Sequence, residues 1–285
     1  MELNLGIRGH DVDFAEPQQI AEEVSSKGLH AVQLALAKSF KNIPTETGTL
    51  SPGYAKYMKH TFKQQDIDIA ILGCYINMIH PHKEKREQLL ARFKEHIRFA
   101  RDFGCSIVAS ETGNINEKMG YTEDNFTEEA FQKVVSSVKE LTDEAEKWGV
   151  IVGIEGGINH PIHTPQKMKR LIDEVDSNHL QVIFDPANFM SMENYEQQED
   201  VFAESFELFG DRIIAIHAKD FVIEDNWIKM VPVGKGLLNY PLLFEWLKEH
   251  KPYIEVLLEN TKEPYINDSI RYLKEKYSSS TQQVI

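Results

Sequence analysis

Apolar runs rich in β-branched residues alternate with amphipathic helical segments eight times along this 285-residue chain. The runs are continuously apolar, which is typical of strands buried on both faces of a parallel sheet. Strands are predicted at residues 3–7, 31–36, 67–76, 105–110, 150–155, 179–185, 212–217 and 253–259. Helices are predicted at residues 16–27, 52–65, 83–103, 127–148, 165–175, 200–209, 240–250 and 268–277.

Eight strand–helix units of roughly 30 to 35 residues match a (β/α)8 barrel, a fold of about 250 residues. An open, doubly wound sheet is the alternative fold. The segment GIRGHD after the first strand lacks the glycine spacing of a dinucleotide-binding turn, so the barrel is favoured. We predict one α/β domain, a TIM barrel over residues 1–278, followed by a flexible polar tail at residues 279–285.

Composition restricts the partners of the protein. The formal net charge is -14 and no basic run is present, so a nucleic-acid partner is not expected. Cys74 and Cys105 both lie in apolar runs and are predicted to be buried thiols. The first residues lack the features of a signal peptide, and no apolar run is long enough to span a membrane. We therefore expect a cytoplasmic protein with no membrane partner.

Four consecutive predicted strands each end on a residue that can bind a metal: Glu155, Asp185, His217 and Glu259. The loops after the strands are long and those before them are short, and in (β/α)8 barrels function is located at the carboxyl ends of the strands. Any one of these residues alone can be a solvated residue at the start of a loop. Four on neighbouring strands predict one divalent metal ion, since carboxylate and imidazole ligands suit Mn, Co, Mg or Zn.

Sequence motifs surround the same four positions. They are GIEGG at 153–157, FDPANF at 184–189, IHAKD at 216–220, VGKGLLNY at 233–240 and LLEN at 257–260. With these motifs the chain resembles the xylose isomerase-like TIM barrels, in particular the sugar phosphate isomerases/epimerases and ketose 3-epimerases. The resemblance implies Glu155, Asp185, His217 and Glu259 as ligands of one metal, such as manganese. It also implies a role in carbohydrate metabolism, a small sugar or sugar phosphate as substrate, and a homo-oligomer.

The resemblance implies chemistry at a carbon next to a carbonyl. A metal would stabilise the enediolate, and a carboxylate would remove the proton. We assign Glu155 and Glu259 as the acid/base pair. Further substrate contacts are predicted at the same face for Arg8, His80, Glu111, His163, Asn188 and Lys219. For each of them a solvated loop residue is the alternative interpretation, and Lys235 between two glycines is a weaker candidate for binding phosphate.

The sequence departs from the ketose 3-epimerase pattern at three places. Asn188 stands where histidine is usual, Lys219 and Asp220 follow His217 without a later arginine, and Gln33 replaces a glutamate. A metal-dependent dehydratase of the inosose or dehydroshikimate type is therefore the alternative reaction, because it begins with the same proton abstraction. An enzyme like endonuclease IV is a remote alternative, since it needs further metal ligands, and a non-catalytic binding protein would hold no metal.

Overall fold

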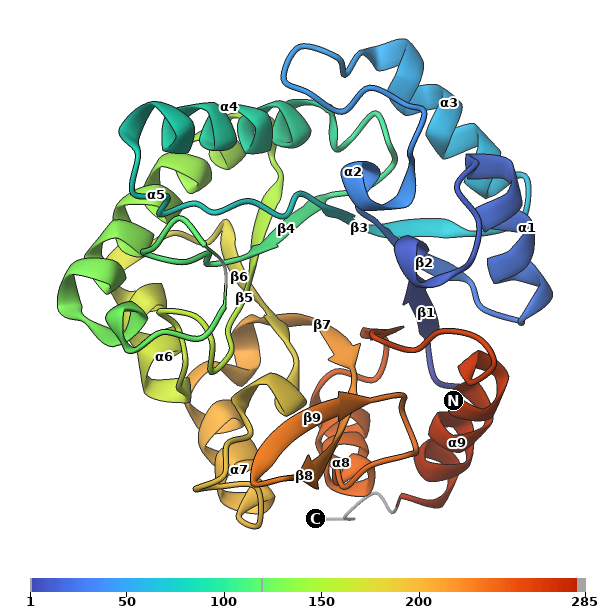
Figure 1. The fold of residues 1–285 in the computed structure, drawn as a ribbon. Helices are drawn as coiled ribbons and strands as arrows, with labels where there is room; N and C mark the ends of the chain where they lie inside the picture. The colour runs from blue at the N-terminus through green and yellow to red at the C-terminus, as the bar shows by residue number, and fades with distance from the viewer. Residues whose placement is uncertain (1, 119, 281–285) are drawn as a thin grey trace.

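The protein is described by a computed structural model over residues 2–118 and 120–280. Eight parallel strands close into a barrel in the order β1-β10-β7-β6-β5-β4-β3-β2, and helices surround it (Figure 1). This confirms the predicted barrel. The barrel strands are β1 Leu5–Arg8, β2 Ala31–Leu34, β3 Asp68–Gly73, β4 Ile107–Glu111, β5 Ile151–Glu155, β6 Leu180–Phe184, β7 Ile213–Ala218 and β10 Glu255–Leu258.

The helices lie close to their predicted positions. They are α1 Pro17–Ser26, α2 Leu36–Ser39, α3 Pro52–Lys63, α4 Lys83–Phe99, α5 Glu128–Trp148, α6 Pro165–Val175, α7 Gln198–Phe209, α8 Tyr240–His250 and α9 Ile266–Ser279. Short 3-10 turns include η1 Gly9–Asp11 and η3 Pro186–Phe189. Ser51 caps α3 by accepting the amide of Tyr54, and Gly149 ends α5 with a φ of 60°, the left-handed conformation that favours glycine.

Many predicted boundaries differ from the observed ones by a few residues, and two of these differences concern an adjoining element. The second strand ends at Leu34, because the chain turns at Ala35 into the short helix α2. Helix α9 continues to Ser279, where the polar tail was predicted to begin, and residues 281–285 of that tail lie outside the described part of the chain. Both cysteines are buried and free, as predicted. No helix in the described residues is long and apolar enough to cross a membrane.

An antiparallel hairpin, formed by β8 (Asp220–Glu224) and β9 (Trp227–Val231), was missed in the loop predicted between residues 218 and 239. Its turn residues, Asp225 and Asn226, have φ values of 52° and 61°. Two consecutive positive φ values are typical of the tight turns whose twist suits a hairpin. The hairpin lies over one side of the barrel mouth (Figure 1), and Met230 on β9 lines the pocket there.

Small and medium apolar side chains fill the barrel interior. The inner cluster contains Ala31, Ile71, Ala109, Ile183, Ala215 and Leu257. At Gly6 on β1, a Cβ atom would lie 2.5 Å from the carbonyl oxygen of Ala31, so a side chain does not fit there. The much larger outer cluster packs the strands against the helices. The interior is therefore a packed core that supports the mouth from below.

The residues two positions beyond this inner layer form the floor of the barrel mouth. Successive side chains of a strand alternate between its two faces, so a residue two positions after an inward-facing one faces inward again. The residues placed in this way are Arg8, Gln33, Glu111, Glu155, Asp185, His217 and Glu259. The strand period of two thus brings polar groups from seven strands to one end of the barrel.

A candidate metal centre in the barrel mouth

Glu155, Asp185, His217 and Glu259 form one buried cluster, in which one ligand atom from each side chain lies within 4.8 Å of the others. All four are nearly inaccessible to solvent, at 0–4% exposure. Buried carboxylates at this density are costly unless a cation lies among them. The strand ends therefore converge, as the sequence predicted.

The orientation of the His217 ring is set by Gln33 at the end of β2. Gln33 donates its amide to the hydroxyl of Tyr75 at 2.6 Å, so its carbonyl oxygen is left to accept from Nε2 of His217, also at 2.6 Å. With one proton at Nε2, Nδ1 is the nitrogen that faces the carboxylates, and it would become a metal ligand once its own proton is lost. Nδ1 lies 3.1 Å from Glu155 Oε2 and 2.8 Å from Glu259 Oε2.

Three atoms of the cluster test whether these residues fit a metal ion. Asp185 Oδ2, His217 Nδ1 and Glu259 Oε2 are buried and have no partner with hydrogen-bond geometry among the described residues. Their close contacts are ion pairs: Asp185 Oδ2 with Lys219, and His217 Nδ1 with Glu155 and Glu259. Buried polar atoms nearly always have hydrogen-bond partners, so three without hydrogen-bond geometry in one acidic cluster are consistent with a cation site. Their oxygen and nitrogen donors match a divalent ion such as Mn, Co, Mg or Zn. The residues therefore fit the metal that the sequence predicted.

Without a cation, charges among these residues shift their pKa values. Burial alone lowers the pKa of His217, but Glu155 and Glu259 together outweigh it and raise the pKa to about 10. Burial raises the pKa of Asp185 to about 6 despite the neighbouring ammonium of Lys219. Metal binding therefore has to displace a proton from His217 near neutral pH.

Lys219 and Arg8 supply fixed positive charge beside the cluster. Lys219 Nζ lies 2.9 Å from Asp185 Oδ2 and 2.6 Å from Glu259 Oε1, and Arg8 Nη1 lies 2.8 Å from the same Glu259 oxygen. Burial alone would raise the pKa of Glu259, but Lys219, Arg8 and His217 hold it well below its usual range. Glu259 is therefore held ionised, with Oε1 bound by two cations.

Asn188 links the two sides of the cluster. It stands in η3, three residues after Asp185, and its amide nitrogen donates to Glu155 Oε1 at 2.7 Å. Its carbonyl oxygen accepts from Lys219 Nζ at 2.9 Å. In this chain asparagine therefore contacts one carboxylate and one ammonium at the position where the epimerase pattern has histidine.

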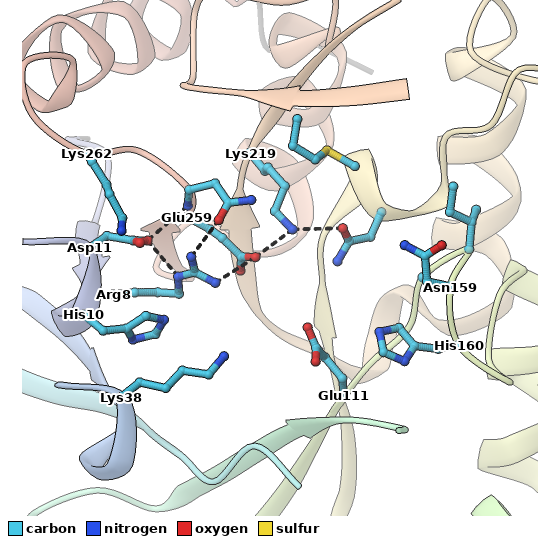
Figure 2. Close-up of a pocket in the computed structure, with 15 residues that line it drawn as sticks. Arg8, His10, Asp11, Lys38, Glu111, Asn159, His160, Lys219, Glu259 and Lys262 are labelled. Atoms are coloured by element: carbon cyan, nitrogen blue, oxygen red, sulfur yellow. Dashed lines mark hydrogen bonds and ion pairs between the residues drawn. The ribbon is translucent and has the colours of Figure 1, made fainter. Parts of the chain in front are cut away.

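A pocket of about 460 Å³ opens above the cluster. Figure 2 shows Glu259 and Lys219 at its centre, Arg8 and Lys38 on one side, and His160 on the other. This volume lies within the range of small-ligand sites. Of the metal cluster, Glu259 lines the pocket, and Glu155 contacts the lining residue Asn188.

The predicted substrate residues divide into two groups. Arg8, Glu111, Asn188 and Lys219 line the pocket. His80 and His163 lie outside its lining: His80 packs against His82, and the ring of His163 lies 4.2 Å from that of Phe126. The pocket geometry therefore does not support these two predicted contacts, which stay predictions.

Other lining residues, Lys38 and Lys262 among them, were not predicted, and Gln33 was noted only as a departure from the pattern. A glutamine inside the buried run AVQLAL was the available signal for Gln33, because a buried polar side chain needs a partner. The suggested phosphate site at Lys235 is wrong. The amides of Gly234 and Gly236 donate to Asp220 at 2.9 and 3.1 Å, which occupies them within the protein.

Comparisons with known proteins agree with the fold. A family model described as xylose isomerase-like TIM barrel matches residues 21–276. A D-tagatose 3-epimerase-like protein is 19% identical, with each chain covered over 100% and a TM-score of 0.76. The 3-keto-D-glucoside 4-epimerase YcjR from E. coli is 17% identical over 96% of this chain and 100% of its own, with a TM-score of 0.75. None of the curated proteins compared with the chain matches it.

Structures with other chemistry share the same barrel. AsbF from Bacillus anthracis, described as a probable 3-DHS dehydratase, is 13% identical over 99% of this chain and 100% of its own, with a TM-score of 0.72. The IOLI protein, whose structure holds a zinc atom, is 16% identical over 99% of both chains, with a TM-score of 0.70. At these identities the likeness shows the fold and leaves the reaction to be argued from the site.

Proposed function

Since the chain belongs to the xylose isomerase-like TIM barrel family, we propose that it is a divalent-metal-dependent isomerase or epimerase of a sugar or sugar phosphate. One observation carries the proposal. Four buried residues with metal-ligand chemistry lie together under a pocket large enough for a sugar, and three of their ligand atoms, on Asp185, His217 and Glu259, have no partner with hydrogen-bond geometry among the described residues. Such a site suits proton abstraction next to a carbonyl, because negative charge develops on an oxygen that a nearby cation can stabilise.

Glu155, Asp185, His217 and Glu259 would hold the metal. When bound, the ion would act as a Lewis acid toward the carbonyl oxygen of the substrate. Lys219 and Arg8 add positive charge at the same place, and both line the pocket.

Glu155 and Glu259 are the proposed acid/base pair, and their surroundings differ. Glu155 Oε1 faces the neutral amide of Asn188, so accepting a proton there breaks no ion pair. Protonation of Glu259 Oε1 would weaken its ion pairs with Arg8 and Lys219. Glu155 is therefore the better candidate for the first proton acceptor.

Solvent exchange tests this assignment. Glu155→Gln and Glu259→Gln in the manganese-loaded protein are expected to lose deuterium incorporation from D₂O into ketoses by at least about 100-fold, the usual scale of general acid–base catalysis. Glu255→Gln is the matched control, since Glu255 begins the strand that Glu259 follows. Circular dichroism checks that each variant is folded. Undiminished exchange in either site variant would remove that residue from the proton-transfer role.

The same experiment separates the alternative reactions. The similarity to AsbF is the reason to test for a dehydratase. A dehydratase removes water from the substrate, whereas an isomerase or epimerase conserves every atom except the exchanged hydrogen. Mass spectrometry of the product distinguishes these outcomes. An enzyme like endonuclease IV is not favoured: strands β2, β3 and β4 contribute Gln33, Gly73 and Glu111 here, which do not make a second metal site within the described residues.

A further inference from the structure

Basic side chains gather on one side of the pocket mouth, although the protein as a whole has a formal charge of -14. Figure 2 shows Lys262, Arg8 and Lys38 on this side, which lies above strands β10, β1 and β2. His10 lies here too but adds no charge, because burial and the nearby Arg8 lower its pKa to about 3. The facing side carries the uncharged amide of Asn159. The pocket is therefore electrostatically asymmetric, with its basic wall on strands next to those that hold the metal cluster.

The charges of this wall are not equally available. Arg8 is used within the protein, because its guanidinium contacts Asp11 at 2.8 Å, Glu259 at 2.8 Å and Asn260 at 3.0 Å. Lys38 and Lys262, in contrast, make no ion pair within 4.0 Å in residues 2–118 and 120–280. Both ammonium groups can therefore bind an anionic ligand without breaking an ion pair.

Lys38 differs from an ordinary solvated surface lysine. Its ammonium lies 3.6 Å from the centroid of the Tyr75 ring, and burial lowers its pKa. A cation held against an aromatic face and partly removed from water attracts an anion more strongly than a freely hydrated one. Tyr75 also accepts the amide of Gln33, which positions His217, so Lys38 stands at a fixed place relative to the metal cluster.

The carboxylates of the pocket set the direction in which an anion can lie. Asp11 is neutralised locally, since one of its oxygens accepts from both Arg8 Nε and the amide of Asn260. Glu111, at the end of β4, lies away from Lys262 and Arg8 but acts on the charge of Lys38, and it would repel an anion placed beside it. A charged ligand group is therefore directed toward the basic wall, and uncharged hydroxyls toward Glu111, Asn159 and His160.

Resting on the proposed function, we propose that the substrate is an acidic sugar derivative whose phosphate or carboxylate group, remote from the reacting carbons, binds between Lys38 and Lys262. The reacting end then lies over the metal cluster, and the anion lies at the β10–β1–β2 side of the mouth. Either kind of substrate, a phosphate ester or a uronate, would present an oxyanion to the two lysines.

Three probes with the same carbon skeleton test the substrate class: D-fructose, D-fructose 6-phosphate and D-fructuronate. We expect the wild-type, manganese-loaded protein to exchange solvent deuterium into at least one anionic probe with a kcat/KM at least tenfold above that for fructose. Lys38→Gln/Lys262→Gln is expected to lower this ratio at least tenfold, mainly through KM. The larger of the two anionic rates identifies phosphate or carboxylate. Equal rates for all three probes, or an unchanged ratio in the variant, would overturn the proposal.

A binding measurement keeps this test independent of catalysis. Inorganic phosphate and D-glucuronate are titrated calorimetrically into the wild type, the double variant and Lys56→Gln, a control that changes an exposed charge on α3. We expect wild type and control to bind one of the anions at least tenfold more tightly than the double variant. Because all three proteins keep the metal site, the difference isolates the lysines. Equal binding in the double variant would refute the anion site even if exchange occurs, whereas lysine-dependent binding without any exchange would refute only the proposed reaction.

Discussion

Replacing Lys219 by methionine keeps most of the side-chain volume but removes the ammonium that lies between Asp185 and Glu259. Both contacts are shorter than 3 Å, and all three side chains are at most 5% exposed. Leaving buried carboxylates without their cation costs about 3–5 kcal/mol. Without metal, the variant is therefore expected to lose about that much free energy of unfolding.

A bound divalent ion changes this cost, because it neutralises the carboxylates that Lys219 leaves behind. With saturating Mn²⁺ the loss is expected to fall to about 1.5–3 kcal/mol, the value of a hydrogen bond to a charged group. The difference between the two conditions must appear as tighter metal binding, since binding and stability are linked. Lys219→Met should thus bind Mn²⁺ roughly tenfold more tightly than the wild type, as about 1.4 kcal/mol corresponds to a factor of ten.

Urea unfolding in EDTA and in excess Mn²⁺ measures the free energy of unfolding without and with metal. Calorimetric titration measures the affinity for Mn²⁺ directly. Lys229→Met is the matched control: it removes an exposed ion pair with Glu224 on the hairpin and should cost no more than about 1 kcal/mol in either condition. If Lys219→Met lost the same free energy of unfolding with and without metal, or bound Mn²⁺ more weakly, Lys219 and the ion would not neutralise the same carboxylates.

Two further predictions concern the histidine ligand. Because the carboxylates raise the pKa of His217 to about 10 in the absence of metal, binding requires its deprotonation; metal affinity should rise about tenfold per pH unit through neutrality and level off near pH 10. Calorimetry in buffers of different ionisation enthalpy should then count about one released proton at pH 7, and none would contradict the assignment. Gln33→Leu removes the acceptor of His217 Nε2 and should weaken metal binding about 10- to 100-fold. Tyr75→Phe, which keeps that acceptor, should weaken it much less.

The candidate metal-binding cluster was predictable because it depends on local pattern. Each of the four residues stands at the end of an apolar run, which marks the carboxyl end of a buried strand. In a parallel barrel all such ends meet at one mouth, so Glu155, Asp185, His217 and Glu259 could be grouped before their distances were known. The short helix α2 was missed because Leu36 continues an apolar run. The β8–β9 hairpin was missed although its two apolar runs flank the turn residues Asp225 and Asn226, because the whole stretch from 218 to 239 was assigned to one loop.

The contacts that adjust the site could not be found in this way. Arg8 meets Glu259 across 251 positions of sequence, and Gln33 meets His217 across 184. Neither pair follows from any local period, since each depends on the closure of the barrel between its first and last strands. His80 and His163 lie in loops at the mouth, but neither lines the pocket: His80 contacts His82 and His163 contacts Phe126. Their predicted substrate contacts stay predictions. The cytoplasmic location and the homo-oligomer stay predictions.

By itself, the sequence determined the eight strand–helix units, the barrel they form and the four residues whose side chains close its last strands. Hydrophobic periodicity and glycine or capping signals are properties of neighbouring residues, so they can be read without coordinates. Only the tertiary structure decided which nitrogen of His217 faces the carboxylates, which carboxylate contacts two cations, and which pocket lysines form no ion pair within the described part of the chain. Those outcomes depend on electrostatic and hydrogen-bond distances of about 3 Å between distant strands, and they vanish when the chain is extended.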